Sequence, residues 1–279
     1  MEPIVLFRYS DEVDEEFQAI FAEPWIYNSR TLLPKNSLVV ARYSCLPFYK
    51  ELEQDLAWQG SKLINSWEQH TYIADIENWY EDLKDFTPQT WFDWSCLPEG
   101  SFVLKGRTNS KKFQWNTQMF AKTREDVPRI ANNLLNDQLI SQQGLCVRKY
   151  VPLKRFDTSI NGLPITDEWR VFFYKNTIIS YGYYWSNFAD KQPYLTLPGP
   201  ALRLLRQVGE IASKKTNFFV VDIARTEDND WIVIELNDGQ MSGLSMNEPN
   251  QFYERLMFIV KNDLQLQGTE KSTNLPVSL

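Results

Sequence analysis

The chain has 279 residues, of which 43% are hydrophobic, and it carries a formal net charge of −7. That length can bury one large core or divide into two or three small domains. The acidic balance argues against nonspecific binding to duplex DNA or anionic membranes, and the single histidine argues against histidine-based metal sites and nucleophilic triads.

Targeting and oxidation signals are not evident in the sequence. The N-terminus, MEPIVLFRYSDEVDEE, lacks the basic-then-apolar order of a signal peptide. Cys45, Cys96 and Cys146 are odd in number and far apart, as is typical of reduced thiols. No apolar run reaches the length of a membrane span. We therefore expect a cytoplasmic protein, with His70 in a surface or helix-capping position.

Residues 1–94 alternate strand-like and helix-like segments, which predicts a small α/β domain. Apolar, β-branched runs predict strands, and apolar residues at helical spacing predict two amphipathic helices. The expected strands are residues 4–10, 37–44 and 61–66, and the expected helices are residues 46–60 and 67–86.

Residues 95–151 predict a second unit, which begins with a hairpin. GSFVLKG and FQWNTQMFA are predicted to form two strands joined by a polar loop. A helix is expected next, with Thr123 and Asp126 in a capping arrangement at its start. The following apolar run, LCVRKYVPL, predicts a strand that ends at a proline.

Residues 152–265 predict a third unit with two hairpins and two helices. The expected strands are residues 167–174, 176–185, 218–224 and 231–237, and the expected helices are residues 200–215 and 248–263. The remaining residues, 266–279, are polar and are predicted to form a flexible tail.

The strands FFVVDIA and WIVIELN carry three polar side chains in otherwise apolar runs. A turn centred on residues 228 and 229 would place Asp222 opposite Glu235 and Val220 opposite Asn237. Opposed residues share one face of a sheet, so Asp222, Glu235 and Asn237 would cluster there, and a shared proton or a cation would have to offset the repulsion between the carboxylates. An all-oxygen cluster suits Mg²⁺ or Mn²⁺. The alternative is an exposed polar sheet face with an arginine or lysine nearby.

Basic segments elsewhere predict a phosphate site. VLKGRTNSKK places Lys105 at a strand end and further basic and hydroxyl side chains in the loop after it, where they could cradle phosphate oxygens or simply be solvated. Arg170 lies within an apolar strand, with Glu168 two residues earlier on the same face. It could clamp a transferring phosphoryl group or form half of an internal ion pair.

The order of these segments resembles the ATP-grasp superfamily, which includes D-alanine–D-alanine ligase, glutathione synthetase and the ribosomal-protein glutamate ligases. A lysine-ended strand, a loop, a helix, KYV, E-x-R and VVDIA…IVIELNDGQMSGL follow one another within residues 95–262. The chain is most similar to small, divergent ATP-grasp proteins of phages and bacteria. The resemblance implies an α+β or α/β chain with the ATP-grasp fold. Its parts would be a preceding α/β domain (1–94), a lid-and-hinge subdomain (95–151) and a C-terminal subdomain with the metal site (152–265).

The resemblance also implies roles for the matching residues. Asp222, Glu235 and Asn237 would hold one or two Mg²⁺ ions, or Mn²⁺, that bridge the phosphates of ATP. Arg170 and Arg225 would stabilise the γ-phosphate and the acyl-phosphate transition state. The nucleotide would be bound by Lys105, Arg107, Ser110 and Lys111, by the hinge residues Arg148, Lys149, Tyr150 and Val151, and by Asp157 at the ribose. The family hinge usually has an acidic residue where this chain has Arg148, which leaves the nucleotide's identity open.

The implied activity is an ATP- and Mg²⁺-dependent ligase that joins a carboxylate to an amine or related nucleophile through an acyl phosphate. Its substrates would be small molecules or peptides, including protein targets, and GQMSGL would hold the acceptor. A kinase or phosphotransferase and a nucleotide-binding module without turnover are the alternatives. We expect no membrane or nucleic-acid partner, and a homodimer is left open.

Overall fold

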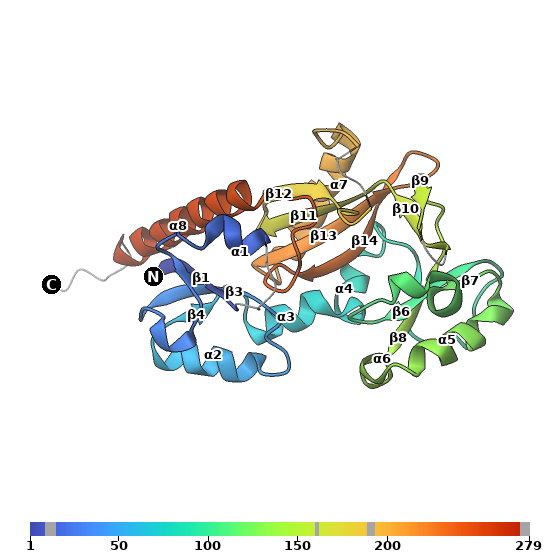
Figure 1. The fold of residues 1–279 in the computed structure, drawn as a ribbon, viewed down its shortest axis with the longest axis horizontal. Coiled ribbons are helices and arrows are strands. Elements are labelled where there is room, and N and C mark those ends of the chain that lie inside the picture. The colour runs from blue at the N-terminus through green and yellow to red at the C-terminus, as the bar shows by residue number, and fades with distance from the viewer. Residues whose placement is uncertain (9–14, 160–161, 189–192, 274–279) are drawn as a thin grey trace.

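The computed structural model describes residues 1–8, 15–159, 162–188 and 193–273. Three sheets form the framework of these residues: an N-terminal parallel sheet, a middle antiparallel sheet and a C-terminal antiparallel sheet (Figure 1). Their order along the chain is the order that the sequence predicts. Within the described ranges, no helix is both long and apolar enough to cross a membrane.

The N-terminal sheet has the strand order β2-β1-β3-β4, and its strands are parallel. The strands are β1 (Glu2–Phe7), β2 (Ile26–Tyr27), β3 (Ser37–Arg42) and β4 (Lys62–Leu63), and the nearby helices are α1 (Glu15–Ile20), α2 (Tyr49–Trp58) and α8 (Pro249–Thr273). Every residue of β3 is buried, as expected for a parallel strand covered on both faces. Leu52 of α2 packs on one face and Phe252 of α8 packs on the other.

One predicted helix is in fact two, α3 (Trp67–Ala74) and α4 (Ile76–Leu83). The break falls at Asp75, whose backbone leaves the helical region and whose carboxylate accepts the Glu77 N–H as an N-cap. The prediction of a surface or capping histidine is wrong. His70 is only 5% exposed, stacks on Tyr49, and lies with Nδ1 3.0 Å from Oδ2 of Asp238.

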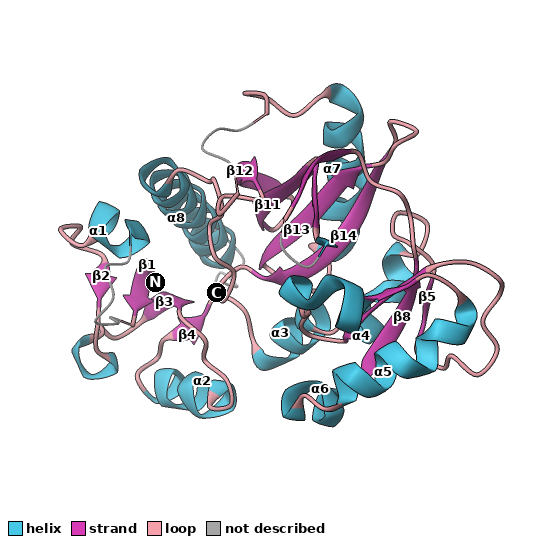
Figure 2. Cartoon of the chain, turned by 45° about the vertical axis from the view of Figure 1, so that its right-hand side comes forward, coloured by secondary structure: helices cyan, strands magenta, loops and turns pink. Residues whose placement is uncertain are grey.

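The middle sheet has the order β5-β8-β6-β7 and is covered by two helices (Figure 2). Its elements are β5 (Thr90–Trp91), β6 (Phe102–Gly106), β7 (Phe120–Ala121), β8 (Leu145–Lys149), α5 (Val127–Leu135) and α6 (Gln138–Gln143). The predicted hairpin pairs Phe102 with Ala121, but most of its second arm forms helical turns over residues 112–119. Thr123 and Asp126 form the predicted capping box. Strand β5 pairs with β8, so this unit begins a few residues before position 95.

The C-terminal sheet has the order β12-β11-β13-β14, and all its strand pairs are antiparallel. The strands are β11 (Glu168–Tyr174), β12 (Thr177–Tyr183), β13 (Phe218–Arg225) and β14 (Trp231–Asp238); α7 (Gly199–Ala212) follows β12, and the short pair β9 (Arg155–Thr158) and β10 (Pro164–Thr166) precedes β11. Helix α8 continues to Thr273, whereas the sequence predicts a tail from residue 266. Residues 274–279 of that tail lie outside the described residues.

The two faces of the C-terminal sheet differ in chemistry. Trp169 and Val221 lie on the face that packs against α4 and α7 in the largest core cluster. Phe172 and Val220 lie on the other face and pack against α8. Arg170 and Asp222 pair across the neighbouring strands on this second face, so a charged patch adjoins the apolar one.

The register of the β13–β14 hairpin is the predicted one at the polar end. Asp222 pairs with Glu235, and Val220 pairs with Asn237. The turn itself is shorter than expected on one side, since Arg225 pairs with Trp231. A β-bulge reconciles the two, because Ile234 is an extra residue opposite the Asp222–Ile223 step.

Gly182 of β12 lies against the backbone of the loop that follows β14. A Cβ at this position would overlap the backbone of Met246 and Asn247, whereas a Cβ at Gly243 would meet nothing within 4 Å. Overpacking of this kind costs about 1–3 kcal/mol. We therefore expect Gly182→Ala to lower the free energy of unfolding by that amount and Gly243→Ala to change it little, as measured by chemical denaturation. Equal stabilities of the two variants would contradict the close approach.

Candidate functional site

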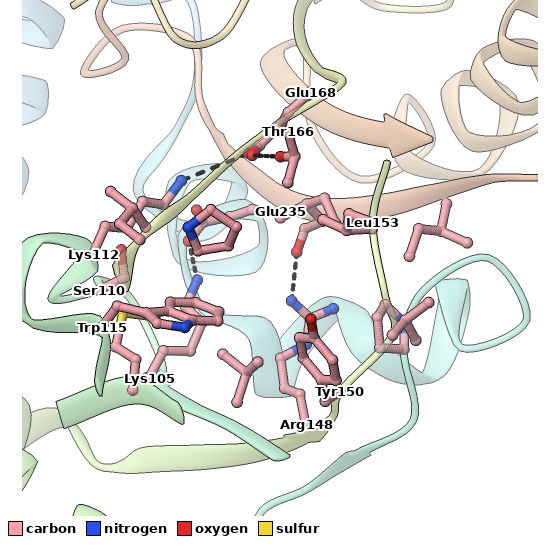
Figure 3. Close-up of a pocket in the computed structure, with 18 of the residues that line it drawn as sticks. Lys105, Ser110, Lys112, Trp115, Arg148, Tyr150, Leu153, Thr166, Glu168 and Glu235 are labelled. Atoms are coloured by element: carbon pink, nitrogen blue, oxygen red, sulfur yellow. Dashed lines mark hydrogen bonds and ion pairs between the residues drawn. The ribbon is translucent and has the colours of Figure 1, made fainter. Parts of the chain in front are cut away.

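A cleft lies between the middle sheet and the C-terminal sheet (Figure 3). Strands β6 and β8 supply one wall, and β14 supplies the other. The segments 150–155 and 163–166 and the turns 110–119 complete it. Because each wall is a hydrogen-bonded sheet, the side chains that face the cleft are held by rigid elements.

The bulge in β14 determines which of its side chains reach the cleft. Side chains of a regular strand alternate between faces, but Ile234 and Glu235 are consecutive and both line the cleft. Their neighbours Val233 and Leu236 both enter the core below. The extra residue thus places an apolar side chain and a carboxylate together on one wall.

One half of the cleft is apolar. Val103, Met119, Leu153 and Ile232 line it, next to the 150–151 segment that connects the middle sheet to the rest of the chain. The N–H of Val151 donates no backbone hydrogen bond among the described residues. A flat apolar slot beside an unused backbone donor can hold a heterocycle and read one of its edges.

The other half of the cleft is charged and mostly buried. Lys105 of β6 is 5% exposed and forms an ion pair with Glu235. Lys112 lies with Nζ 3.6 Å from Oε1 of Glu168 and 2.8 Å from the Tyr184 hydroxyl, to which it donates. Its ammonium is also 3.9 Å from the centre of the Tyr184 ring.

The pKa values of these groups follow from their surroundings. Burial alone would raise the pKa of the Glu235 carboxyl, but Lys105 and Lys112 outweigh it and lower that pKa to about 2. Burial raises the pKa of Glu168, although Lys112 opposes the shift. Desolvation would lower the pKa of Lys112, but Glu168 raises it above the ordinary value. Glu235 and Lys112 therefore remain charged at neutral pH.

Arg148 is a buried cation without an acidic partner among the described residues. Its guanidinium donates to the Ile234 carbonyl at 2.6 Å and to the Thr87 and Thr90 hydroxyls at 2.6 and 3.3 Å. Burial lowers the pKa of this guanidinium. Placing an uncompensated charge in a protein interior is costly, so such a residue suits a site that receives an anion.

Asp222 is completely buried, and both of its oxygens accept hydrogen bonds from Arg170, at 2.9 Å from Nε and 2.8 Å from Nη2. Arg170 also donates to the Gly243 carbonyl at 3.0 Å. The two carboxylates that face each other across the hairpin therefore each have a cation, Arg170 for Asp222 and Lys105 for Glu235. This is the ion pair foreseen for Arg170, but with Asp222 in place of Glu168.

The structure brings together most of the residues that the sequence predicts for nucleotide binding. Those that line the cleft are Lys105, Ser110, Arg148, Lys149, Tyr150 and Val151. Asp222, Glu235 and Asn237 share the predicted face of the hairpin. Arg170 lies on the neighbouring strand, opposite Asp222.

Two basic residues of the loop lie elsewhere. Arg107 pairs with Asp75 and Glu77 at the start of α4. Lys111 is 2.5 Å from Asp137 at the start of α6. Neither side chain lines the cleft, because carboxylates outside the cleft bind both of them.

Asp157 and Arg225 are also placed away from the cleft. Asp157 lies on an exposed strand and accepts the Thr158 N–H. Arg225 is three residues from Asp222 in one strand, so it points to the opposite face, the face on which Ile223 joins the core. The structure thus gives no support to a ribose contact by Asp157 or to a catalytic role for Arg225.

Sequence reasoning missed the roles of Lys112 and Glu168, which line the charged half of the cleft. Glu168 carries a usable signal, since it lies two residues from Arg170 in a strand and must share its face. Lys112 carries no such signal, because nothing in the sequence distinguishes it from its neighbour Lys111.

The donor set is compatible with Mg²⁺. Among the described residues, no three His, Cys, Asp or Glu side chains form a preassembled metal cage. Mg²⁺ usually takes one or two carboxylates and completes its shell with phosphate oxygens and water. Glu235 and Asn237, with Asp222 opposite, are hard oxygen donors of the required kind. Oε1 of Glu168 is buried without a hydrogen-bond partner, so this side of the cleft has acceptor capacity to spare.

Solved structures with the same fold cover nearly the whole chain. D-alanine–D-alanine ligase from Bacillus anthracis complexed with ATP has a TM-score of 0.58 at 11% identity, over 96% of this chain and 98% of that one. D-cycloserine synthetase DcsG has a TM-score of 0.55 at 12% identity, over 91% and 98%. The ATP-grasp ligase PsnB complexed with minimal precursor has a TM-score of 0.51 at 13% identity, over 91% and 99%. These similarities establish the fold.

A comparison with curated protein sequences finds no match. A family model, described as an ATP-grasp domain and the third family of its clade, matches residues 92–256, which is more than half of the chain. The matched region includes the cleft, the hinge and the β13–β14 hairpin. The chain therefore belongs to this family of the ATP-grasp superfamily.

Proposed function

We propose that this protein is an ATP- and Mg²⁺-dependent ligase that joins a carboxylate to an amine through an acyl phosphate. The observation that carries the proposal is the division of the cleft into an apolar half and a half with buried cations. A nucleotide has the same division between its base and its phosphates. Membership of the ATP-grasp superfamily supports ATP as the nucleotide.

The base would occupy the apolar half, where Val103, Leu153 and Ile232 would contact its faces. The N–H of Val151 would donate to its edge. The phosphates would then reach Lys105 and Arg148, which lie on adjacent antiparallel strands and both line the cleft. Cations at this point would compensate the phosphate charge, and their hydrogen bonds to charged oxygens would be strong.

Magnesium would be held by Glu235 and Asn237, with Asp222 next to them, and would neutralise charge on the phosphates. Lys105 holds Glu235 in place. Arg170 in turn holds Asp222 in the sheet. The cations would thus orient the metal ligands and contribute to the phosphate site.

The chemistry would consist of two displacements. A carboxylate oxygen of the substrate attacks the γ-phosphorus, and the bond from that phosphorus to the β,γ-bridging oxygen breaks to release ADP. The amine nitrogen then attacks the acyl carbon, inorganic phosphate leaves, and the amine loses a proton. Lys112 and Arg170 lie at the end of the cleft where charge would develop, and both retain N–H donors for it.

The test is a panel of carboxylates incubated with ATP and Mg²⁺, with and without hydroxylamine as a general nucleophile. A ligase gives ADP, phosphate and a hydroxamate. A kinase gives ADP and a phosphorylated acceptor without a hydroxamate. Nucleotide binding without ADP formation from any carboxylate would contradict the proposal and favour the binding module.

A further inference from the structure

A second cavity adjoins the charged half of the cleft. Lys112, Leu163 and Trp185 line both cavities, so the two spaces meet at these side chains. Arg170 and Gly243 form its floor near the β13–β14 hairpin. A molecule in this second cavity would therefore have one end close to the site proposed for the γ-phosphate.

The walls of this cavity are unusually aromatic. Tyr184 and Trp185 lie edge to face with ring centres 5.1 Å apart, and Trp185 and Phe188 lie edge to face at 5.9 Å. Phe113 lines the opposite side, on the turn that follows Lys112. Phe188 is 38% exposed and Phe113 is 54% exposed, whereas Trp185 is 6% exposed. The rings thus extend from the buried end of the cavity to solvent.

Two cations mark the buried end. The guanidinium of Arg170 lies 4.8 Å from the centre of the Tyr184 ring, and the ammonium of Lys112 lies 3.9 Å from it. Arg170 has five N–H donors, of which Asp222 and Gly243 take three. Lys112, Arg170, Lys105 and Arg148 outnumber the three carboxylates of the described site, so this end retains positive charge.

We propose that this cavity binds the substrate of the ligase and that the substrate is a carboxylate carrying an aromatic ring. The carboxylate would lie against Arg170 and Lys112, and the ring would pack against Trp185, Phe188 and Phe113. Aromatic pairs gain energy beyond their buried area when they stack or meet edge to face, which favours an aryl group over an aliphatic chain. This inference rests on the proposed ligase activity for the role of the carboxylate.

Calorimetry with 3-phenylpropanoate and hexanoate tests the inference without turnover. We expect 3-phenylpropanoate to bind at least about tenfold more tightly than hexanoate, corresponding to an aromatic contribution of about 1.4 kcal/mol. Phe188→Leu is expected to remove most of this difference. Phe258→Leu is the matched control, because Phe258 is 67% exposed on α8 and lines neither cavity.

The Kd of a nonhydrolysable ATP analogue with Mg²⁺, measured on the same proteins, separates the two proposals. Equal affinities for the two carboxylates, or an aryl preference that survives Phe188→Leu, would overturn the aromatic substrate class. If nucleotide binding is intact in that case, the ligase proposal stands. Absence of nucleotide binding would instead overturn the ligase proposal, while an aryl preference that is lost in Phe188→Leu would still support the cavity.

Discussion

Replacement of Glu235 by glutamine is expected to reduce Mg²⁺-dependent ADP formation by at least about 100-fold. The carboxylate is held in its charged form, since Lys105 and Lys112 overcome the effect of burial and lower its pKa to about 2. Glutamine has nearly the same shape but no charge, so a metal bound to phosphate would lose an anionic ligand. Lys105 would also lose its partner in a largely buried position.

The matched control is Glu227→Gln, at the other end of the same hairpin. Glu227 is exposed in the turn between β13 and β14 and lines neither cavity. Both variants lose one negative charge, so a difference between them reports position and not net charge. Thermal unfolding of each variant would check that the fold is retained. Wild-type turnover in folded Glu235→Gln would remove Glu235 from the metal site.

The β13–β14 hairpin was predictable because its information is local. A polar turn fixes the approximate register, and period-two alternation fixes the face, so the pairing of Asp222 with Glu235 follows from the sequence. The same alternation already excludes Arg225, which lies three residues from Asp222 and must face the other way. The bulge at Ile234 was not predictable, since no glycine or other local signal marks it.

The destinations of the loop cations could not be read from the sequence. Arg107, Lys111 and Lys112 lie within six residues, yet Asp75, Asp137 and Glu168 respectively bind them. These partners are 32, 26 and 56 positions away. Long-range packing brings each partner to the loop, so composition alone shows a basic segment and not which cation enters the cleft.

Buried polar groups outside the cleft were underestimated for the same reason. Arg42 was assigned to a surface role or to the acceptor, but it is 7% exposed and pairs with Glu16. It also donates to the Gln240 carbonyl in the loop after β14. The N-terminal domain therefore helps to fix the loop that leads to Gly243, a connection that no local pattern indicates.

Lys105→Met is expected to raise the Kd of a nonhydrolysable ATP analogue with Mg²⁺ by about 10- to 100-fold, because a hydrogen bond to a charged group contributes about 1.5–3 kcal/mol. Methionine keeps most of the apolar stem of lysine, so β6 should still pack against its neighbours. The loss of the ammonium leaves Glu235 without its ion-pair partner and leaves Arg148 as the nearest cation on this wall. The measurement is calorimetric titration of the purified variant.

Lys111→Met provides the comparison that makes this result specific. Lys111 lies six residues later in the same segment and loses the same charge, but its ammonium is bound to Asp137 outside the cleft. General electrostatic attraction of ATP to a basic loop would weaken binding similarly in both variants. A built phosphate site requires a large effect at Lys105 and less than about a twofold effect at Lys111. Similar losses at the two positions would mean that the cleft does not hold the phosphates where Lys105 meets Glu235.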